Sequence, residues 1–556
     1  MRHRGTVLSV ALVLVLFAPG IWWGLPFIDG REAERGWAVD DETPLGALAE
    51  ARQVFVRGGE RNYGYPLFYY YISVAAYTPY LGYLLATNQF SKPTDRYPFG
   101  LANATHALRV MSLISKGLTL LLAMAVVYGA YHAARLTWTD RAGVFAAILV
   151  ALLYPLAYYA RTGNVDVPML GLSAIGLAAY CAIARDGITT RRAVTLGAAA
   201  GLAMATKDSA VGLFAAVPLA MFAVPRPSGT AFPWRTWGIA AVAGFVALGI
   251  GSGLFIDPVR YYYHLMELVG RLDSVPRTAS LYFALPNTAA GHLAALKFQA
   301  VGSMQGLTFF GLMLAVAGIA LFVPGNRQAR LLLLPALTYS AFVFFFLRAE
   351  QLRYLLPLGF VLALFAGAAA DAGTRSPVRI RAAAAWGLLA AAISISTLRL
   401  ADLTHAMVRD SRYEAAEWLA TRLAPGDRVE FFGASQKLPR LPAGVVVERA
   451  AVYQGMHTLH DTSAAHADSI VAGWMTRRPT MVIVIPDHSR LFADAPFDGS
   501  MPPALFRRLE SGELPWRRAA RFETPPLLPL VRRPGLDYPV VNPPVHIYAP
   551  SPAVQR

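Results

Sequence analysis

Long apolar runs separated by short polar loops occupy the first four hundred residues of the chain. A helix needs about 20 consecutive apolar residues to cross the hydrocarbon core of a bilayer. The pattern therefore predicts an all-α polytopic membrane domain with about 11 transmembrane helices. The expected spans lie near residues 6–23, 109–134, 142–160, 167–184, 193–206, 209–224, 237–256, 306–323, 331–347, 354–370 and 382–400.

Arginine in alternate loops predicts the orientation of these spans. Short cytoplasmic loops carry an excess of Lys and Arg. With the N-terminus inside, the short loops contain Arg135 and Arg141, then Arg185, Arg191 and Arg192, then Arg226 and Arg235, then Arg327 and Arg330, and finally Arg375, Arg379 and Arg381. The same alternation places residues 24–108, 257–305 and everything after 401 outside.

The first apolar run follows Arg2 and Arg4, a pattern that a cleaved signal peptide also has. No A-x-A cleavage motif follows it, and Trp22 and Trp23 are typical of an anchor at the membrane surface, so we expect a retained span. Within the first external segment, Tyr65 to Leu85 is rich in tyrosine. We expect one or two helices along the outer surface there; the alternative, a pair of spans, would break the arginine pattern downstream.

Composition supports a membrane protein with one soluble part. Only 15% of the 556 residues are charged and the mean hydropathy is +0.42, against about 25% charged in soluble domains. The net charge of +16 reflects the loop arginines, and no basic motif with interleaved aromatics indicates nucleic-acid binding. The single cysteine, Cys181, lies in an apolar run and excludes an intramolecular disulfide.

After Ala401 the density of charge returns to the level of soluble proteins. Residues 411–423 have a helical period, "RVEFFG", "GVVVE" and "TMVIVIP" predict short buried strands, and residues 465–475 predict a helix. Alternating helices and strands indicate a small C-terminal α/β soluble domain. We therefore expect a membrane domain at 1–400 and an extracytoplasmic domain at 401–556, with an irregular Pro-rich tail from Pro525 to Pro552.

The acidic residues Asp40, Asp41 and Glu42 follow the first span. Adjacent carboxylates repel one another, which raises the pKa of at least one unless a cation neutralises them. A carboxylate with a raised pKa is a competent general base. A solvated acidic turn is the alternative.

Other charged residues gather at the predicted outer ends of the spans. Arg161 and Asp166 could form a structural ion pair, or Asp166 could be a second acid of the same cavity. Lys207, Arg348 and Arg353 could clamp a departing phosphate, or snorkel to lipid headgroups. Weaker candidates are Tyr261, Tyr262, Tyr263, His264, Glu350 and Gln351. The chain contains no zinc-binding Cys/His spacing, Walker loop, Rossmann fingerprint or G-x-S-x-G.

In their order along the chain, these segments resemble the GT-C superfamily of membrane glycosyltransferases, and within it the protein O-mannosyltransferase and aminoarabinose-transferase type of family 39. The resemblance covers about residues 6–400. It rests on "VDDETP", "YPLFYYYI", "YARTGNVDVPML", "GLAMATKDSAVGL" and "LRYLLPLGFVLAL". Tyr65 departs from the His or Lys usual in the family, and the "WWDYG" signature of oligosaccharyltransferases is absent.

The resemblance implies an inverting transferase that moves a hexosyl or pentosyl group from a polyprenyl-phosphate sugar to an external hydroxyl of a lipid, glycan or protein. It implies Asp41 as the catalytic base, with Asp40 as its rival, and a substrate-binding role for Arg161, Asp166, Lys207, Arg353 and Tyr354. The positions of the charged and polar residues add Glu42, His264 and Arg348 as substrate-binding candidates. It implies no certain cofactor, with a divalent metal near Asp40–Glu42 left open, and a bacterial inner membrane as the location. A transporter or flippase of lipid-linked sugars, or a non-catalytic envelope scaffold, is the rival function.

Overall fold

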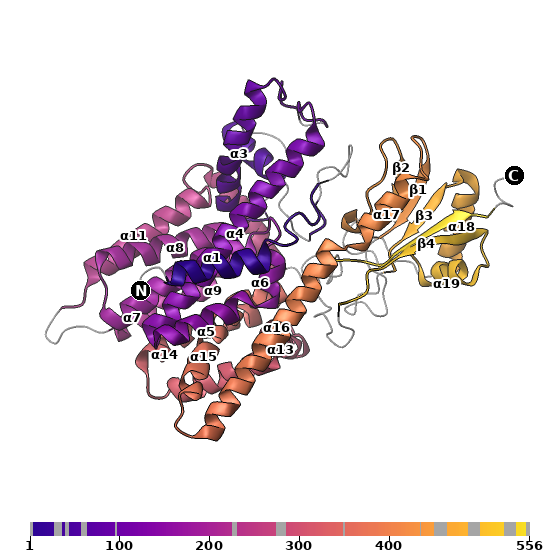
Figure 1. Cartoon of the computed structure of the whole chain (residues 1–556). Coiled ribbons are helices and arrows are strands. Elements are labelled where there is room, and N and C mark those ends of the chain that lie inside the picture. Colours follow the sequence, from indigo (N-terminus) through magenta and orange to yellow (C-terminus); the bar gives the residue numbers. More distant parts are fainter. Residues whose placement is uncertain are drawn as a thin grey trace. The chain divides into compact units, whose positions relative to one another are not determined.

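The computed structural model describes twelve segments of the chain. They are residues 4–26, 36–38, 44–56, 64–94, 97–224, 231–273, 285–348, 351–433, 435–449, 464–486, 501–527 and 541–551. The chain divides into two compact units. The helical unit holds residues 1–21, 42–83 and 111–400, and the sheet unit holds residues 22–41, 84–110 and 401–556. Helices and strands carry the labels of Figure 1.

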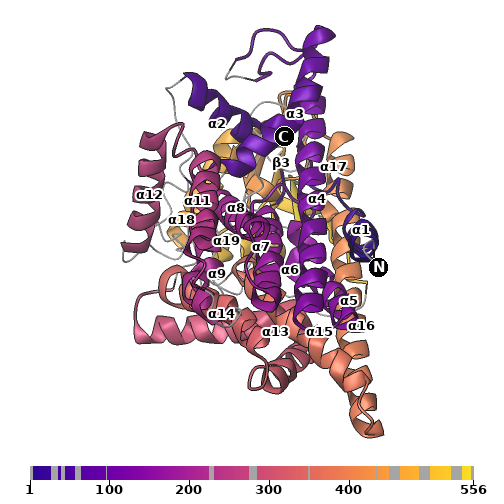
Figure 2. The same ribbon diagram turned by 90° about the vertical axis from the view of Figure 1, so that its left-hand side faces the viewer.

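The helical unit consists of packed helices with short turns (Figure 2). Their bounds are α1 Arg4–Phe17, α2 Pro44–Val56, α3 Phe68–Ala86, α4 Ala104–Thr137, α5 Asp140–Ala151, α6 Tyr154–Tyr159, α7 Asp166–Asp186, α8 Thr190–Thr206, η1 Asp208–Ala210, α9 Val211–Phe214, α10 Val217–Ala220, η2 Met221–Ala223, α11 Trp234–Gly251, α12 Pro258–Asp273, α13 Ala289–Phe322, α14 Arg327–Phe342, η3 Val343–Leu347, η4 Leu352–Leu355, α15 Leu356–Thr374 and α16 Arg379–Val408. The ends of α3, α4 and α16 extend into the residues of the sheet unit.

Within the described residues, seven helices are long and apolar enough to cross a membrane. They are Ala104–Thr137, Asp166–Asp186, Trp234–Gly251, Ala289–Phe322, Arg327–Leu347, Leu352–Thr374 and Arg379–Ala420. The remaining expected spans fall on shorter helical segments: α1, α5 with α6, α8, and the series from η1 to η2. The expected total of eleven spans therefore stays a prediction. The Tyr-rich stretch after Tyr65 forms one helix, α3, and its place along the outer surface stays a prediction.

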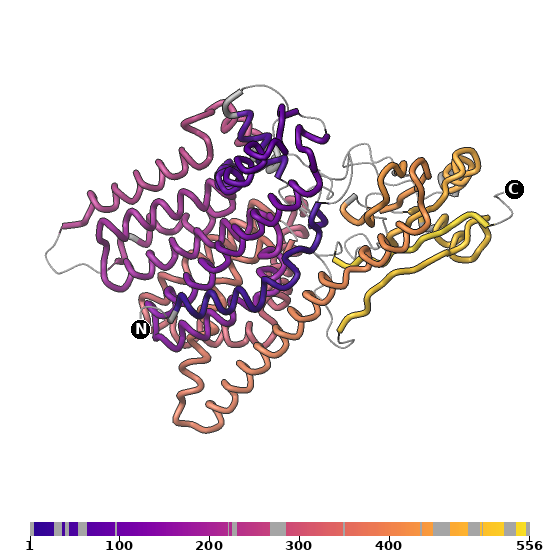
Figure 3. Tube along the Cα trace, turned by 45° about the horizontal axis from the view of Figure 1, so that its top comes forward, coloured from indigo at the N-terminus to yellow at the C-terminus, as the bar shows by residue number. Residues whose placement is uncertain are grey.

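Glycine allows two of these helices to pack with their backbones close together. The helices α7, α8 and α11 run alongside one another (Figure 3). A Cβ added at Gly197 of α8 would lie 2.0 Å from the carbonyl oxygen of Ala240 in α11, and one at Gly201 would lie 2.2 Å from that of Gly244. Small residues at a helix interface permit such an approach, as is common in membrane proteins.

The sheet unit contains a five-stranded sheet in the order β2-β1-β3-β5-β4. The strands are β1 Arg428–Phe432, β2 Val446–Arg449, β3 Met481–Val484, β4 Trp516–Phe522 and β5 Val545–Pro550. Strand β1 pairs in parallel with β2 and β3, whereas β5 is antiparallel to β3 and β4. The helices are α17 Ser411–Ala420, α18 Ala464–Arg477 and α19 Pro503–Ser511, with the short η5 Ser435–Lys437.

Successive residues of these strands point to opposite faces, which gives the sheet two cores. One core joins Phe431 and Ile483 to α17, and the other joins Phe432 and Val484 to α18 and α19. The three strands and two helices expected from the sequence are confirmed. The prediction of an irregular tail from Pro525 to Pro552 is wrong at Val545–Pro550, because these residues form β5, which lies between β3 and β4 and is largely buried. Residues 528–540 of this stretch lie outside the described residues.

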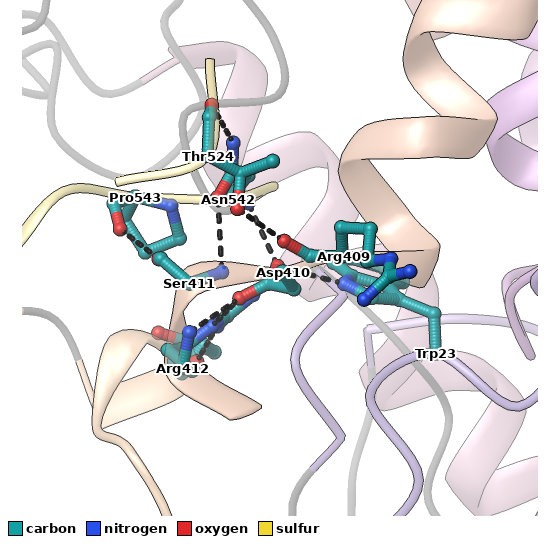
Figure 4. A network of polar contacts seen from close by, with 9 residues as sticks. Trp23, Arg409, Asp410, Ser411, Arg412, Thr524, Asn542 and Pro543 are labelled. Atoms are coloured by element: carbon teal, nitrogen blue, oxygen red, sulfur yellow. Dashed lines mark hydrogen bonds and ion pairs between the residues drawn. The ribbon is translucent and has the colours of Figure 1, made fainter. Parts of the chain in front are cut away.

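A buried carboxylate joins distant parts of the sheet unit (Figure 4). Asp410 forms an ion pair with Arg412 at 2.7 Å, and both side chains are fully buried. The same carboxylate accepts hydrogen bonds from the indole of Trp23 at 3.0 Å and from the backbone N–H of Asn542 at 2.7 Å. The guanidinium of Arg412 also lies 3.7 Å from the ring centroid of Trp37. Residues 22–26 and 36–38 are therefore held against the start of α17.

Candidate functional site

Three helix ends bring the predicted site residues of the helical unit together. Asp166 is the first residue of α7, and Lys207 directly follows the last residue of α8. These two helices are antiparallel neighbours, so the two side chains lie at the same end of the pair. Arg353 and Tyr354 belong to η4, which leads into the first turn of α15.

Asp166 and Lys207 form a buried ion pair. The ammonium of Lys207 lies 2.6 Å from Oδ1 of Asp166, and the two side chains are 5% and 1% exposed. The backbone N–H of Asp166 donates to Oδ1 of Asn164 at 2.7 Å, which fixes the start of α7. The second carboxylate oxygen, Oδ2, is buried and has no hydrogen-bond partner within the described part of the chain. That oxygen retains the capacity to accept a hydrogen bond from a ligand or from water.

Aromatic rings surround the ammonium of Lys207. Its nitrogen lies 4.6 Å from the ring centroid of Tyr354 and 5.9 Å from that of Tyr65. The guanidinium of Arg353, whose side chain is also buried, lies 5.3 Å from the same Tyr354 ring. Two cations therefore share the ring of Tyr354, and cation–π attraction helps to keep them at this depth. Tyr65 thus lies beside Lys207.

A second buried ion pair contacts the backbone of Tyr65. Arg260 of α12 lies 3.1 Å from Glu50 of α2, with both side chains buried. The guanidinium of Arg260 also donates to the backbone carbonyl of Tyr65 at 3.2 Å. Neither Arg260 nor Glu50 was predicted from the sequence as a site residue. They are 210 residues apart, and no local pattern marks such a pair.

His264 lies one turn further along α12 and faces the same region. Its Nε2 is 3.1 Å from Oδ1 of Asp208, the residue directly after Lys207. Burial, followed by the nearby Asp208 carboxylate, raises the pKa of Tyr261. Asp208 was another residue that the sequence analysis did not name. Its only local signal is its place beside Lys207.

Tyr339 of α14 is a further polar residue at this site. Its hydroxyl is buried and lies within electrostatic reach of Asp166 and Tyr354. Ser209, in η1, is buried close to the same group. Both residues lie in or next to apolar runs, so their sequence context resembles that of ordinary packing positions.

Two predicted cations have other contacts. Arg161 is fully buried and donates to the backbone carbonyls of Leu16 at 2.6 Å, Ala157 at 2.8 Å and Pro19 at 2.9 Å. It thereby connects the C-terminal end of α1 to α6, a role that stabilises the fold. Arg348 has a left-handed backbone (φ 46°), and its Nε donates to the carbonyl of Leu285 at 3.1 Å.

The acids expected to act as the base lie outside the described residues. This applies to Asp40, Asp41 and Glu42, and also to Glu350. Among the residues that the structure describes, no group of three or more His, Cys, Asp or Glu side chains is arranged to hold a metal ion. Around the ring of Tyr354 the described site therefore supplies the buried cations Lys207 and Arg353, the carboxylate of Asp166 and several hydroxyls. Such a set can bind an anion and orient hydroxyl groups beside it.

Comparison with solved structures gives three kinds of neighbour. ArnT from Cupriavidus metallidurans, bound to undecaprenyl phosphate, is 15% identical over 100% of this chain and 99% of its own, with a TM-score of 0.46. The archaeal oligosaccharyltransferase AglB from Archaeoglobus fulgidus, in complex with an inhibitory peptide and a dolichol-phosphate, is 11% identical over 85% and 69%, with a TM-score of 0.43. The arabinofuranosyltransferase AftD from Mycobacteria is 17% identical over 91% and 41%, with a TM-score of 0.37.

These three proteins are glycosyltransferases of the GT-C superfamily, the superfamily that the sequence resembles. No family model and no curated protein matches the chain. Because the TM-scores are below 0.5, the likeness to the solved structures does not by itself establish the reaction. The functional proposal therefore rests on the side chains described above.

Proposed function

We propose that this protein is an inverting glycosyltransferase that moves a sugar from a polyprenyl-phosphate donor to an extracytoplasmic acceptor hydroxyl. The observation that carries the proposal is the buried Asp166–Lys207 pair, with Arg353 and Tyr354 beside it, at the shared ends of apolar helices. A lipid-linked donor must present its phosphate at the membrane edge, where such helix ends lie. The two buried cations supply the charge that a departing phosphate requires.

In the proposed step, a carboxylate removes the proton from the acceptor hydroxyl as its oxygen attacks the anomeric carbon. The new carbon–oxygen bond forms on one face while the bond to the phosphate oxygen breaks on the other. The polyprenyl phosphate leaves with the bonding electron pair. Lys207 and Arg353 stabilise its growing negative charge, and the attack from the opposite face inverts the configuration.

Asp41, with Asp40 as the rival, is the proposed base, and this assignment rests on the family resemblance alone. Asp166 holds the ammonium of Lys207 in place through Oδ1, and its Oδ2 can accept a hydrogen bond from a sugar hydroxyl. The ring of Tyr354 contacts both cations and keeps them close to the same place. We propose that the site lies on the outer face of a bacterial inner membrane, with the N-terminus in the cytoplasm, as the arginines of the short loops predict.

The rival function is a transporter or flippase of lipid-linked sugars. Transporters usually place their charged site near the midplane, where helices are broken. The Asp166–Lys207 pair lies instead at helix ends. This placement favours chemistry at the membrane edge over passage through the bilayer.

The test uses purified full-length protein in nanodiscs with a panel of radiolabelled polyprenyl-phosphate sugars. A transferase releases free polyprenyl phosphate and moves the label to an acceptor or to water. A flippase moves the intact donor between the leaflets of proteoliposomes and leaves the sugar–phosphate bond unbroken. Transbilayer movement of intact donor without any release of polyprenyl phosphate would refute the proposal.

A further inference from the structure

One face of α12 exposes large apolar side chains at helical spacing. Val259, Tyr262, Tyr263 and Met266 are 63%, 55%, 51% and 45% exposed. They occupy positions i, i+3, i+4 and i+7, which form a single stripe along a helix. The described side chains of this stripe carry no formal charge. A stripe of this kind on a folded protein indicates a surface that contacts something other than water.

The opposite face of α12 is tied firmly to the helical unit. Arg260 and His264, one turn apart, are each 1% exposed. Arg260 pairs with Glu50, and His264 is hydrogen-bonded to Asp208. The helix is therefore fixed in rotation, and its apolar stripe must face outward. Figure 2 shows α12 at the edge of the helical unit.

The apolar stripe continues an exposed apolar surface on α11. In that helix Val242, Phe245, Val246 and Ile250 are 38% exposed or more, again at helical spacing. Phe255 and Ile256, in the short connection from α11 to α12, are about half exposed. Since α11 is long and apolar enough to cross a membrane, its exposed surface is the one that faces lipid. The stripe on α12 begins where this surface ends.

We infer that α12 is an interfacial helix, whose stripe of Val259, Tyr262, Tyr263 and Met266 binds the lipids of the outer leaflet at the boundary between headgroups and acyl chains. Tyrosine is enriched at this depth because its ring is apolar and its hydroxyl is polar. An amphipathic helix with apolar residues on one face binds in the plane of the interface. The inference does not depend on the proposed reaction, and its assignment to the outer leaflet follows the orientation that the loop arginines predict.

A consequence concerns the candidate site. The same helix carries His264 against Asp208, beside Lys207, and Arg260 against the backbone of Tyr65. Lipid contact on the outer face thus holds these inner contacts at the level of the headgroups. The phosphate group of a membrane lipid lies at the same depth and could therefore reach the candidate site.

The test labels single cysteines with a nitroxide and measures their exposure to oxygen and to a water-soluble nickel chelate. The sole cysteine, Cys181, is buried, so Cys181→Ala provides the background. In nanodiscs of phosphatidylethanolamine and phosphatidylglycerol, labels at Val259→Cys, Tyr262→Cys and Met266→Cys should collide mainly with oxygen. Val242→Cys in α11 and the exposed Met475→Cys in the sheet unit are the lipid and water controls.

Two results would overturn the inference. Labels on α12 that collide with the nickel chelate as readily as the label at Met475→Cys would place the stripe in water. Labels that are shielded from both reagents would mean that a protein, such as a second copy of this chain, covers the stripe. Each variant is first checked for an unchanged elution volume and melting temperature, so that misfolded protein is not scored.

Discussion

The buried pair of Asp166 and Lys207 leads to a prediction about stability and activity together. At 2.6 Å and an effective dielectric constant of about 20, two unit charges attract by about 6 kcal/mol. The loss of hydration offsets most of this attraction, but removal of one partner leaves the other charge buried and alone. Such single removals typically cost about 3–5 kcal/mol.

We therefore expect Lys207→Met and Asp166→Asn each to lower the free energy of unfolding by several kcal/mol. Asp166→Asn should cost less than Lys207→Met, because an amide remains able to accept a hydrogen bond. The double variant should recover most of the lost stability, since it leaves no unpaired charge at the site. Its activity should stay at least 100-fold below that of the wild type, because the cation that stabilises the leaving phosphate is gone.

The assay combines melting curves of the four proteins in one detergent with the release of polyprenyl phosphate in nanodiscs. Asp371→Asn is the matched control. Asp371 is also buried, accepts a hydrogen bond from Thr139 at 2.6 Å and lies at the far end of α15 from η4. The control should lower stability and leave the activity of the folded fraction near that of the wild type.

Two outcomes would refute this reasoning. A Lys207→Met protein as stable as the wild type would mean that the pair is not buried as described. A double variant with full activity would show that the pair is structural and that the leaving group is stabilised elsewhere.

Three further predictions follow from other residues. Asp41→Asn should abolish the release of polyprenyl phosphate and leave the melting temperature unchanged, whereas Asp40→Asn should remain active. Loss of activity in Asp40→Asn with retained activity in Asp41→Asn would identify Asp40 as the base. Arg353→Lys should lower kcat/KM about 10-fold and Arg353→Ala about 100-fold or more, because a point charge replaces only part of a guanidinium; equal losses from both would contradict a role for charge. Burial, and then the charge of Arg412, lowers the pKa of Lys437 to about 7. The unfolded chain keeps that proton up to about pH 10.4, so the free energy of unfolding of the wild type should rise with pH above 7. A Lys437→Met variant should lack about 2 kcal/mol of this rise between pH 7 and 9. An equal rise in the two proteins would contradict the prediction.

The sequence predicted the elements that depend on local pattern. Each expected span overlaps a helix or a series of helices, because a long apolar run can satisfy its backbone polar groups inside a membrane only by forming a helix. The strands β1, β2 and β3 were predicted in the same way, from short apolar runs between turn residues. The strand β5 was missed because the prolines around it favour irregular structure, and only its pairing with β3 and β4 makes it a strand.

Much of the candidate site was also visible in the sequence, since charged residues beside apolar runs are unusual and costly. That reasoning identified Asp166, Lys207 and Arg353, but it left open whether Asp166 pairs with Arg161. The tertiary structure decided that Lys207, 41 residues away, is the partner of Asp166. It also decided that Arg161 holds α1 through backbone carbonyls, and that Glu50 and Arg260 support Tyr65. Apolar periodicity specifies a helix from neighbouring residues alone, whereas the partner of a buried charge depends on which helices pack together, and that choice is made by contacts between residues far apart in the chain.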